Sequence, residues 1–262
     1  MSKKTKKHKE RNKKNLIILS IIFMILIVSC TGYIIYDKIS QNRNQAMYDE
    51  IDTNIEVPQD IENNKIITEN MKKVISLKQQ NEDVKGWIQI DDTMINYPIL
   101  QTTDNDYYLN YTYKKEKSKY GSIYAKNECD ILDNNSNVII YGHNMRNGQM
   151  FNALLDYTDE SFYKEHKTIK IATENEQSNY LIVAVFKSRI FYQNEENVFR
   201  YYNYTKFNNE ESYNDFLENC RKIQLYDTGV SAEYGEQLIT LITCEYSQKN
   251  GRMVIVAKKT QE

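Results

Sequence analysis

A cysteine and an arginine near the end of this 262-residue chain are residue types that could carry out nucleophilic chemistry. Cys244 ends the apolar run Leu238–Thr243, and Arg252 precedes the run Met253–Ala257. Both runs are rich in residues typical of strands, and the Asn-Gly pair at 250–251 suits the tight turn of a hairpin. If the two strands pair antiparallel, Cys244 and Arg252 lie side by side at one rim.

A thiol beside a fixed cation is a candidate nucleophile. The positive charge favours the thiolate, which is the reactive form of cysteine. Arginine also carries forked donors that can hold a developing oxyanion. The structural alternative is that Cys244 is a small buried hydrophobe and Arg252 a solvated strand flank. A suitable base elsewhere in the chain would favour catalysis.

Histidine is the first residue type to consider as that base, and the chain has three. His8 lies in a basic amino-terminal tail, and His166 lies in the charged stretch 164–167, which is typical of a solvated turn. His143 follows the strand-like run 138–142, and residues at a strand exit are often presented to a site by the rigid scaffold behind them. A lone histidine is more often structural, but His143 is the candidate base for Cys244.

The elements that would position these residues are mostly short strands. Helical patterns are few: an apolar face at Ile67–Leu77, a short pattern near Met150, and another at Glu210–Arg221. This pattern predicts a mainly β domain with peripheral helices (α+β), folded as a barrel or a sandwich. The eight expected strands are Trp87–Ile90, Met94–Leu100, Gly121–Ala125, Asn137–Gly142, Thr168–Thr173, Tyr180–Lys187, Gln237–Thr243 and Met253–Lys258.

The amino-terminal part of the chain has the pattern of a membrane anchor. Residues 1–15 carry eight Lys or Arg and one Glu, and residues 16–36 contain no charge. About 20 apolar residues suffice to cross a membrane, and a basic flank predicts the cytoplasmic side. We therefore expect a cytoplasmic tail at 1–15, a transmembrane anchor at 16–36, an extracellular stalk at 37–64 and an exported domain at 65–262.

Two alternatives to a retained anchor can be considered. A cleaved secretory signal would need a shorter apolar region and a small-residue cleavage site, which the sequence lacks. The run 27–30 is similar to a bacterial lipoprotein processing box, in which Cys30 would be lipidated. The apolar stretch continues through Tyr36, which argues against that processing. In either case the domain would be tethered outside the membrane.

Outside the anchor three cysteines remain, Cys129, Cys220 and Cys244, and an odd set leaves at least one free thiol. A Cys129–Cys220 bridge is possible in an oxidising compartment, but the sequence does not establish it. No Cys/His spacing typical of zinc is present, so we expect no metal. The formal net charge of the chain is −2 although its tail is basic, and an acidic exported domain does not support nucleic-acid binding.

The segments around the candidate residues resemble the class B sortases of Gram-positive bacteria. TLITC at 240–244, followed by Arg252 in GRMVIVAKK, and VIIYGHNM at 138–145 carry the resemblance. It extends to residues 77–100 and to the long insertion between Phe186 and Gln237. The resemblance implies a closed eight-stranded β-barrel with amino-terminal helices and a helix in the connection before the cysteine strand.

The resemblance also implies an activity. Sortases are cysteine transpeptidases that cut a sorting signal near the carboxyl end of exported surface proteins and join the new carboxyl group to a cell-wall amine. It implies that Cys244 forms a thioacyl enzyme with the signal's Thr and that His143 moves the protons. Arg252 would bind substrate and, with the backbone N–H of Glu245, stabilise the oxyanion; Thr243 is a further candidate for substrate binding. No cofactor is implied.

Substrate choice is only partly indicated by the resemblance. The family's signals are similar to NPxTx or LPxTG pentapeptides, and the acceptor is a peptidoglycan cross-bridge amine, on lipid II or on the wall. We expect the connection Lys187–Glu236 to form one wall of the groove, with Tyr192, Tyr201, Tyr202 and Tyr204. A pilin-polymerising sortase, a hydrolytic cysteine peptidase with the same Cys and His, and a catalytically idle binding module remain as alternatives.

Overall fold

The computed structural model describes residues 3–51, 67–131 and 137–260. The chain forms two compact units, residues 1–50 and 51–262, which are described separately. The part of the predicted stalk at 52–64 lies outside the described residues.

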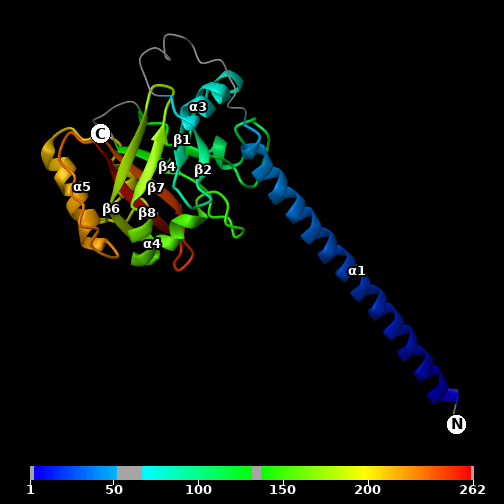
Figure 1. The fold of residues 1–262 in the computed structure, drawn as a ribbon. Coiled ribbons are helices and arrows are strands. Elements are labelled where there is room, and N and C mark those ends of the chain that lie inside the picture. Colours follow the sequence, from blue (N-terminus) through cyan, green and yellow to red (C-terminus); the bar gives the residue numbers. More distant parts are fainter. Residues whose placement is uncertain (1–2, 52–66, 132–136, 261–262) are drawn as a thin grey trace. The chain divides into compact units, whose positions relative to one another are not determined.

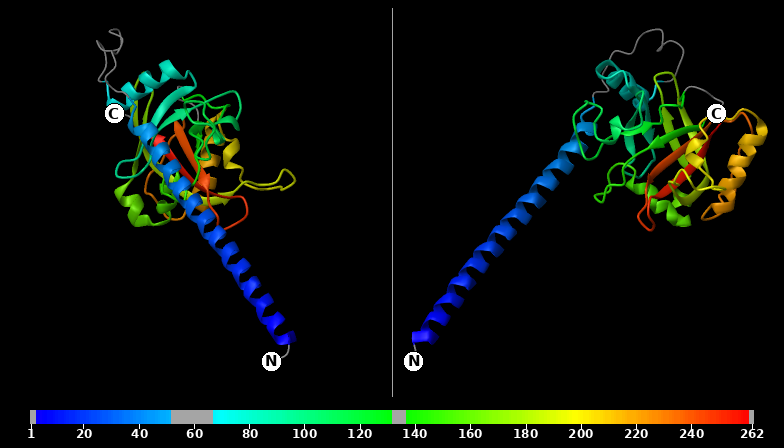
Figure 2. Two further views of the ribbon diagram at one scale, coloured as in Figure 1. Left: turned by 90° about the vertical axis from the view of Figure 1, so that its right-hand side faces the viewer. Right: turned by 180° about the vertical axis from the view of Figure 1, so that it is seen from behind.

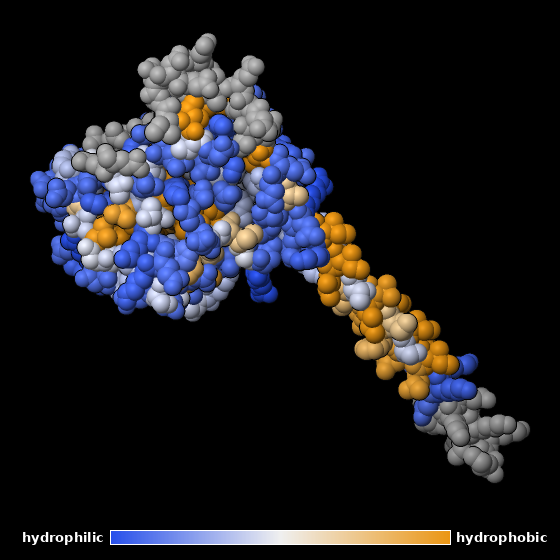
Figure 3. Space-filling view, viewed as in Figure 1, coloured by the Kyte–Doolittle hydropathy of each residue, from blue (hydrophilic) through white to orange (hydrophobic). Residues whose placement is uncertain are grey.

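The first unit is one long helix, α1, which spans Lys3–Asp49. Its large apolar side chains between Leu16 and Ile39 are exposed, and apolar residues cover the helix along the predicted span (Figure 3). It is long and apolar enough to cross a membrane, which fits an anchor. The helix continues into the predicted stalk because residues 37–49 contain no Pro or Gly and include several good helix formers.

The second unit is built on eight strands that close into a barrel (Figure 1). The order around the barrel is β1-β2-β3-β4-β7-β8-β6-β5, and β5 pairs with β1 to close it. The pairs β2–β3 and β4–β7 are parallel and the others antiparallel. The strands are β1 Val84–Gln89, β2 Asn96–Leu100, β3 Ile123–Ala125, β4 Asn137–Tyr141, β5 Thr168–Ala172, β6 Gln177–Arg189, β7 Leu238–Cys244 and β8 Gly251–Lys259.

Each of the eight predicted strands corresponds to one of these elements, and of the two predicted architectures the structure has the barrel. The strand composition was informative because β4, β7 and β8 are almost continuously buried and rich in Ile, Val and Leu. Fully apolar strands suit positions covered on both faces.

Helices pack on different sides of the barrel (Figure 2). α3 (Glu69–Gln80) starts at Thr68, whose hydroxyl accepts a hydrogen bond from the Met71 N–H, and it buries the apolar face predicted there. α5 (Glu210–Ile223) buries Tyr213, Phe216, Leu217 and Cys220 and lies in the connection before β7, as expected.

The remaining helical elements are short. The pattern near Met150 forms a 3-10 helix, η2 (Asn152–Thr158), and α4 (Glu160–Glu165) follows it. α4 was not predicted because it is six residues long and buries only Tyr163, which is too little for a periodic pattern. Two further 3-10 turns, η1 (Tyr107–Leu109) and η3 (Tyr201–Asn203), lie in loops.

Candidate active site

The register of three neighbouring strands brings the predicted catalytic residues together. β4 and β7 are parallel and Tyr141 pairs with Ile242, so extending that register by two residues places His143 level with Cys244. On the other side of β7, Cys244 pairs directly with Arg252 of β8. All three side chains are partly exposed, as residues that act on a substrate must be.

The geometry of the β7–β8 hairpin sets the approach of Cys244 to Arg252. The N–H of Glu245 donates to the carbonyl of Gly251 at 3.0 Å, so the next pair, Cys244 and Arg252, occupies a non-hydrogen-bonded position of the ladder. Side chains opposite each other at such positions come closest. Asn250 has a φ of 57°, as expected for the predicted turn, and a Cβ on Gly251 would lie 2.4 Å from the backbone oxygen of Glu245.

A backbone carbonyl orients the imidazole of His143. Nε2 lies 2.8 Å from the carbonyl oxygen of Leu109, in η1. Because a carbonyl can only accept, Nε2 carries the hydrogen of this bond, and Nδ1 is the nitrogen left for proton transfer. The sequence does not identify an acid that could orient His143, because Asp and Glu are plentiful. It does not identify this partner either, since every residue carries a carbonyl.

The segment after His143 folds back on itself. The carbonyl of His143 accepts a hydrogen bond from the Phe151 N–H at 2.9 Å, and Asn144 pairs with Met150. Gly142 is needed for this packing, because a Cβ there would lie 2.4 Å from Cδ1 of Ile123 and 2.6 Å from Cγ of Phe151. The backbone that carries His143 is therefore fixed by the hydrogen bond from Phe151 and by the close packing at Gly142.

The Arg252 guanidinium is hydrogen-bonded to the backbone of the hairpin turn. Its Nη1 donates to the carbonyl oxygens of Gly251 at 2.8 Å and Asn250 at 3.3 Å. Among the residues that the structure describes, it makes no ion pair with a carboxylate. Its positive charge thus remains available to an anionic group at the rim.

Two groups predicted to act on substrate make contacts within the protein. The side chain of Thr243 is 1% exposed, and its hydroxyl donates to the carbonyl of Gly142 at 2.8 Å, so its role in substrate binding stays a prediction. The N–H of Glu245 is engaged by Gly251, because strand pairing continues one residue past Cys244. It is not a free oxyanion donor in this structure. The Thr243 hydroxyl and the Glu245 N–H thus make hydrogen bonds between neighbouring chain segments at the rim.

The side chain of Glu245 is also engaged within the hairpin. Burial raises its pKa, but hydrogen bonds from Ser247 and the charge of Lys187 outweigh burial, and the net pKa lies below the ordinary value. Its carboxylate accepts from the Ser247 hydroxyl at 2.6 Å and lies 3.6 Å from the Lys187 ammonium. The Glu245 carboxylate thus links the hairpin turn to β6.

Three tyrosines feel the charge of Arg252: Tyr124 and Tyr201, which are buried, and Tyr141, which is half-buried. Burial raises the pKa values of Tyr124, Tyr141 and Tyr201, and the charge of Arg252 opposes that rise in each case. Arg252 therefore lies near all three phenols. Tyr201, which we expected in the groove wall, has a fully buried side chain that packs edge-on against Phe186.

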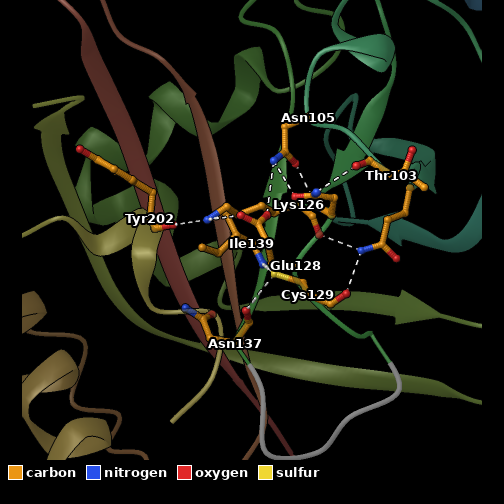
Figure 4. A network of polar contacts seen from close by, with 10 residues as sticks. Thr103, Asn105, Lys126, Glu128, Cys129, Asn137, Ile139 and Tyr202 are labelled. Atoms are coloured by element: carbon orange, nitrogen blue, oxygen red, sulfur yellow. Dashed lines mark hydrogen bonds and ion pairs between the residues drawn. The ribbon is translucent and has the colours of Figure 1, made fainter. Parts of the chain in front are cut away.

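The other three tyrosines of the β6–β7 connection are accessible. Tyr192 is exposed, and a hydrogen bond to Lys249 of the β7–β8 hairpin lowers its pKa. Tyr202 and Tyr204 are partly exposed. The backbone of their segment is held by two hydrogen bonds. Lys126 donates to the Tyr202 carbonyl at 2.9 Å (Figure 4), and Asn137 donates to the Tyr204 carbonyl at 2.8 Å.

The same hydrogen-bond network includes the thiol of Cys129. The Cys129 thiol accepts from the Ile139 N–H at 3.3 Å and lies 3.4 Å from the Asn137 carbonyl (Figure 4). Burial raises its pKa to about 11. Cys129 and Cys220 are both free, so the bridge that the sequence left possible is not formed. Within the described residues, no cluster of His, Cys, Asp and Glu could hold a metal ion.

Comparison with known proteins finds relatives of a single family. A sortase domain model matches residues 88–260. Sortase B of Listeria monocytogenes is 39% identical over 186 residues, which are 70% of this chain and 72% of the relative. The crystal structure of sortase B from B. anthracis in complex with AAEK1 superposes with a TM-score of 0.69 at 32% identity, covering 86% of this chain and 99% of that one.

A third match is a Staphylococcus aureus sortase B–substrate complex, with a TM-score of 0.63 and 30% identity over 72% of this chain and 85% of that one. The barrel and the matched domain define the class of protein: the chain belongs to the sortase family of cysteine transpeptidases. Within that family it groups with class B, since its curated relatives and the solved structures it resembles are sortase B proteins.

Proposed function

We propose that this protein is a membrane-anchored transpeptidase that cleaves a carboxyl-terminal sorting signal after Thr and joins the protein to a cell-wall amine. The observation that carries the proposal is the meeting of His143, Cys244 and Arg252 at one rim of the barrel. The substrates would be exported surface proteins with NPxTx or LPxTG-like signals. The acceptor would be an amine of a peptidoglycan precursor or cross-bridge.

In the first half of the reaction, the Cys244 thiolate attacks the carbonyl carbon of the signal's Thr. Arg252 faces the oxyanion that forms, and this role needs its guanidinium to leave the turn carbonyls. The C–N bond of the signal then breaks, and His143 protonates the leaving amine from Nδ1. The product is a thioacyl enzyme, which divides one difficult exchange into two easier steps.

In the second half, His143 takes a proton from the incoming amine, which attacks the thioacyl carbon. The C–S bond breaks, the new amide leaves, and the Cys244 thiolate is restored. No cofactor enters either half. An exposed groove beside Tyr192, Tyr202 and Tyr204 would receive the signal, because these side chains lie on the connection that follows β6.

The proposal extends to location. α1 would cross the membrane with the basic residues 1–15 in the cytoplasm and the barrel outside. In this orientation the site faces the cell wall, where both substrates of a sortase are found. Accessibility of a cysteine-specific probe at an engineered position in 1–15, in intact against permeabilised cells, measures this orientation. Labelling of the tail in intact cells would contradict it.

The activity is tested with the full-length protein in detergent and fluorogenic peptides that carry NPxTx or LPxTG-like signals, with and without an amine acceptor. We expect cleavage after Thr, diversion of the product to an amide by the amine, and loss of both in Cys244→Ala and His143→Ala. His166→Ala is the matched control. Its imidazole nitrogen Nδ1 bonds the Phe162 carbonyl at 2.9 Å, away from the rim, so activity should persist.

Each other outcome assigns a different function. Cleavage with no amide product would favour a hydrolytic cysteine peptidase. Preference for a lysine side chain of a pilin-like protein as the acceptor would favour a pilin-polymerising sortase. No cleavage of any peptide, with Cys244 unreactive toward thiosulfonates, would refute the catalytic proposal and leave a binding module.

A further inference from the structure

The backbone ladder between β4 and β7 ends just before the catalytic residues. Its last hydrogen bond among the described residues joins the Gly142 N–H to the Ile242 carbonyl at 3.2 Å. Beyond it, two side chains connect the strands: the Thr243 hydroxyl bonds the Gly142 carbonyl, and the Asn144 amide bonds the Cys244 carbonyl at 2.9 Å. The relative position of His143 and Cys244 thus depends on side chains.

The amide of Asn144 is itself held in one orientation. Its Nδ2 donates to the Cys244 carbonyl, and its Oδ1 accepts from Nδ2 of Asn152 at 2.7 Å. The Cys244 carbonyl requires a donor, so the two ends of the amide are distinguished. Turning the amide over would break both bonds. Asn152 is the first residue of η2, so the relay, by which we mean the two hydrogen bonds from Asn152 to Asn144 and from Asn144 to Cys244, ends on a packed element.

The peptide unit that follows the nucleophile is consequently fixed at both ends. Its carbonyl accepts from Asn144, and its N–H, that of Glu245, donates to Gly251. Loss of the Asn144 donor would free one end of this unit and leave a polar carbonyl unsatisfied. Misplacement of a reacting group by about 1 Å can cost about 100-fold in rate.

We infer that Asn144 is a positioning residue that holds Cys244 in register with His143, and that Asn152 acts through it. This inference rests on the proposed transpeptidase function. Neither asparagine touches the reacting atoms. The role is to keep the sulfur and the imidazole at the separation that the proton transfers need.

The test compares Asn144→Ala, Asn152→Ala and the double variant in the full-length protein in detergent. We expect kcat to fall by about 10- to 100-fold in Asn144→Ala with KM changed by less than about two-fold, because the binding groove is left intact. Asn152→Ala should lose less, about 3- to 10-fold, since the donor remains. The double variant should match Asn144→Ala, because Asn152 then has nothing to orient.

Asn147→Ala is the matched control. Asn147 lies in the same loop, is exposed, and its amide bonds only Gln149 at 2.9 Å among the described partners. Its removal should leave kcat unchanged. Kinetic losses that add in the double variant, or kcat within about two-fold of wild type in Asn144→Ala, would overturn the inference.

A second readout does not need a sorting signal. In Asn144→Ala no charge is introduced, but Cys244 loses its register with the cationic groups of the rim, so its alkylation should shift to higher pH. A merely structural role predicts a lower melting temperature with no such shift. If Asn144→Ala does not fold, Asn152→Ala alone decides, since an unchanged kcat there would reject the relay. If wild type cleaves no peptide, the proposed function fails, and the alkylation profile still tests Asn144.

Discussion

Replacing Lys126 by Met should weaken binding of the sorting signal without slowing the chemistry. The Lys126 ammonium donates to the carbonyl of Tyr202, in η3, and the side chain is only 15% exposed (Figure 4). Methionine keeps much of the apolar stem and removes the donor. The Tyr202 carbonyl then loses a charge-assisted hydrogen bond, and this segment of the proposed groove wall becomes looser.

The size of the effect follows from that one bond. Leaving a buried acceptor unsatisfied costs about 1–3 kcal/mol, and the part-buried Tyr202 carbonyl belongs to the lower half of that range. The ion pair of Lys126 with Glu128 adds little, because the Glu128 side chain is 52% exposed and such pairs contribute at most about 1 kcal/mol. Asn137 still holds the Tyr204 carbonyl, so the segment stays folded. If substrate binding must restore the wall, about 1.4–2 kcal/mol corresponds to a 10- to 30-fold rise in KM.

The assay is steady-state cleavage of the preferred peptide by full-length wild type, Lys126→Met, Lys126→Arg and Lys222→Met. Arginine keeps a donor and should restore most of the binding. Lys222 pairs with Glu218 on an exposed face of α5, so its loss should change nothing. A fall in kcat at constant KM in Lys126→Met would refute the reasoning, because it would place the effect on the chemistry.

Three further outcomes are expected. Thiol titration of the folded protein should find Cys244 reactive. Cys129 and Cys220 should react only after denaturation, since burial raises the pKa of both thiols. A disulfide that must be reduced before these two cysteines react would contradict this expectation. Gly142→Ala should lower the free energy of unfolding by about 1–3 kcal/mol in urea titrations, because its Cβ would overlap Phe151; an unchanged midpoint would show that the packing yields. The pKa of Cys129 is raised from 9.0 to about 11, so its contribution to stability is present below pH 9 and is lost as pH rises through 11; this amounts to about 2–3 kcal/mol, and Cys129→Ser should remove that part of the alkaline slope in unfolding measurements.

The barrel and the three catalytic candidates could be predicted because the signals that specify them are local. The strands read as apolar runs, and an Asn-Gly turn between two of them sets Cys244 opposite Arg252. The parallel pairing of β4 with β7, which brings His143 to the same rim, joins segments about 100 residues apart and was not predicted. Composition does not encode which strands become neighbours.

The contacts that orient the site were harder to foresee because they involve the backbone. Leu109 holds His143 through a carbonyl, and Asn144 holds Cys244 through another. Such bonds depend on where a loop passes and not on the side chain at its end. The hydrogen bond of the Glu245 N–H has the same origin, since one further ladder bond past Cys244 decides whether that group is free.

The hydrogen bond from the Glu245 N–H to Gly251 also affects which donor would stabilise the charge on the oxyanion. With the Glu245 N–H donating to Gly251, Arg252 is the donor at the rim whose charge is not neutralised among the described residues, and at rest it bonds the same Gly251 carbonyl. An arginine that leaves a carbonyl for an anion exchanges a weaker acceptor for a stronger one. Substrate attack would itself drive the movement, and the hairpin turn would hold Arg252 close by until then.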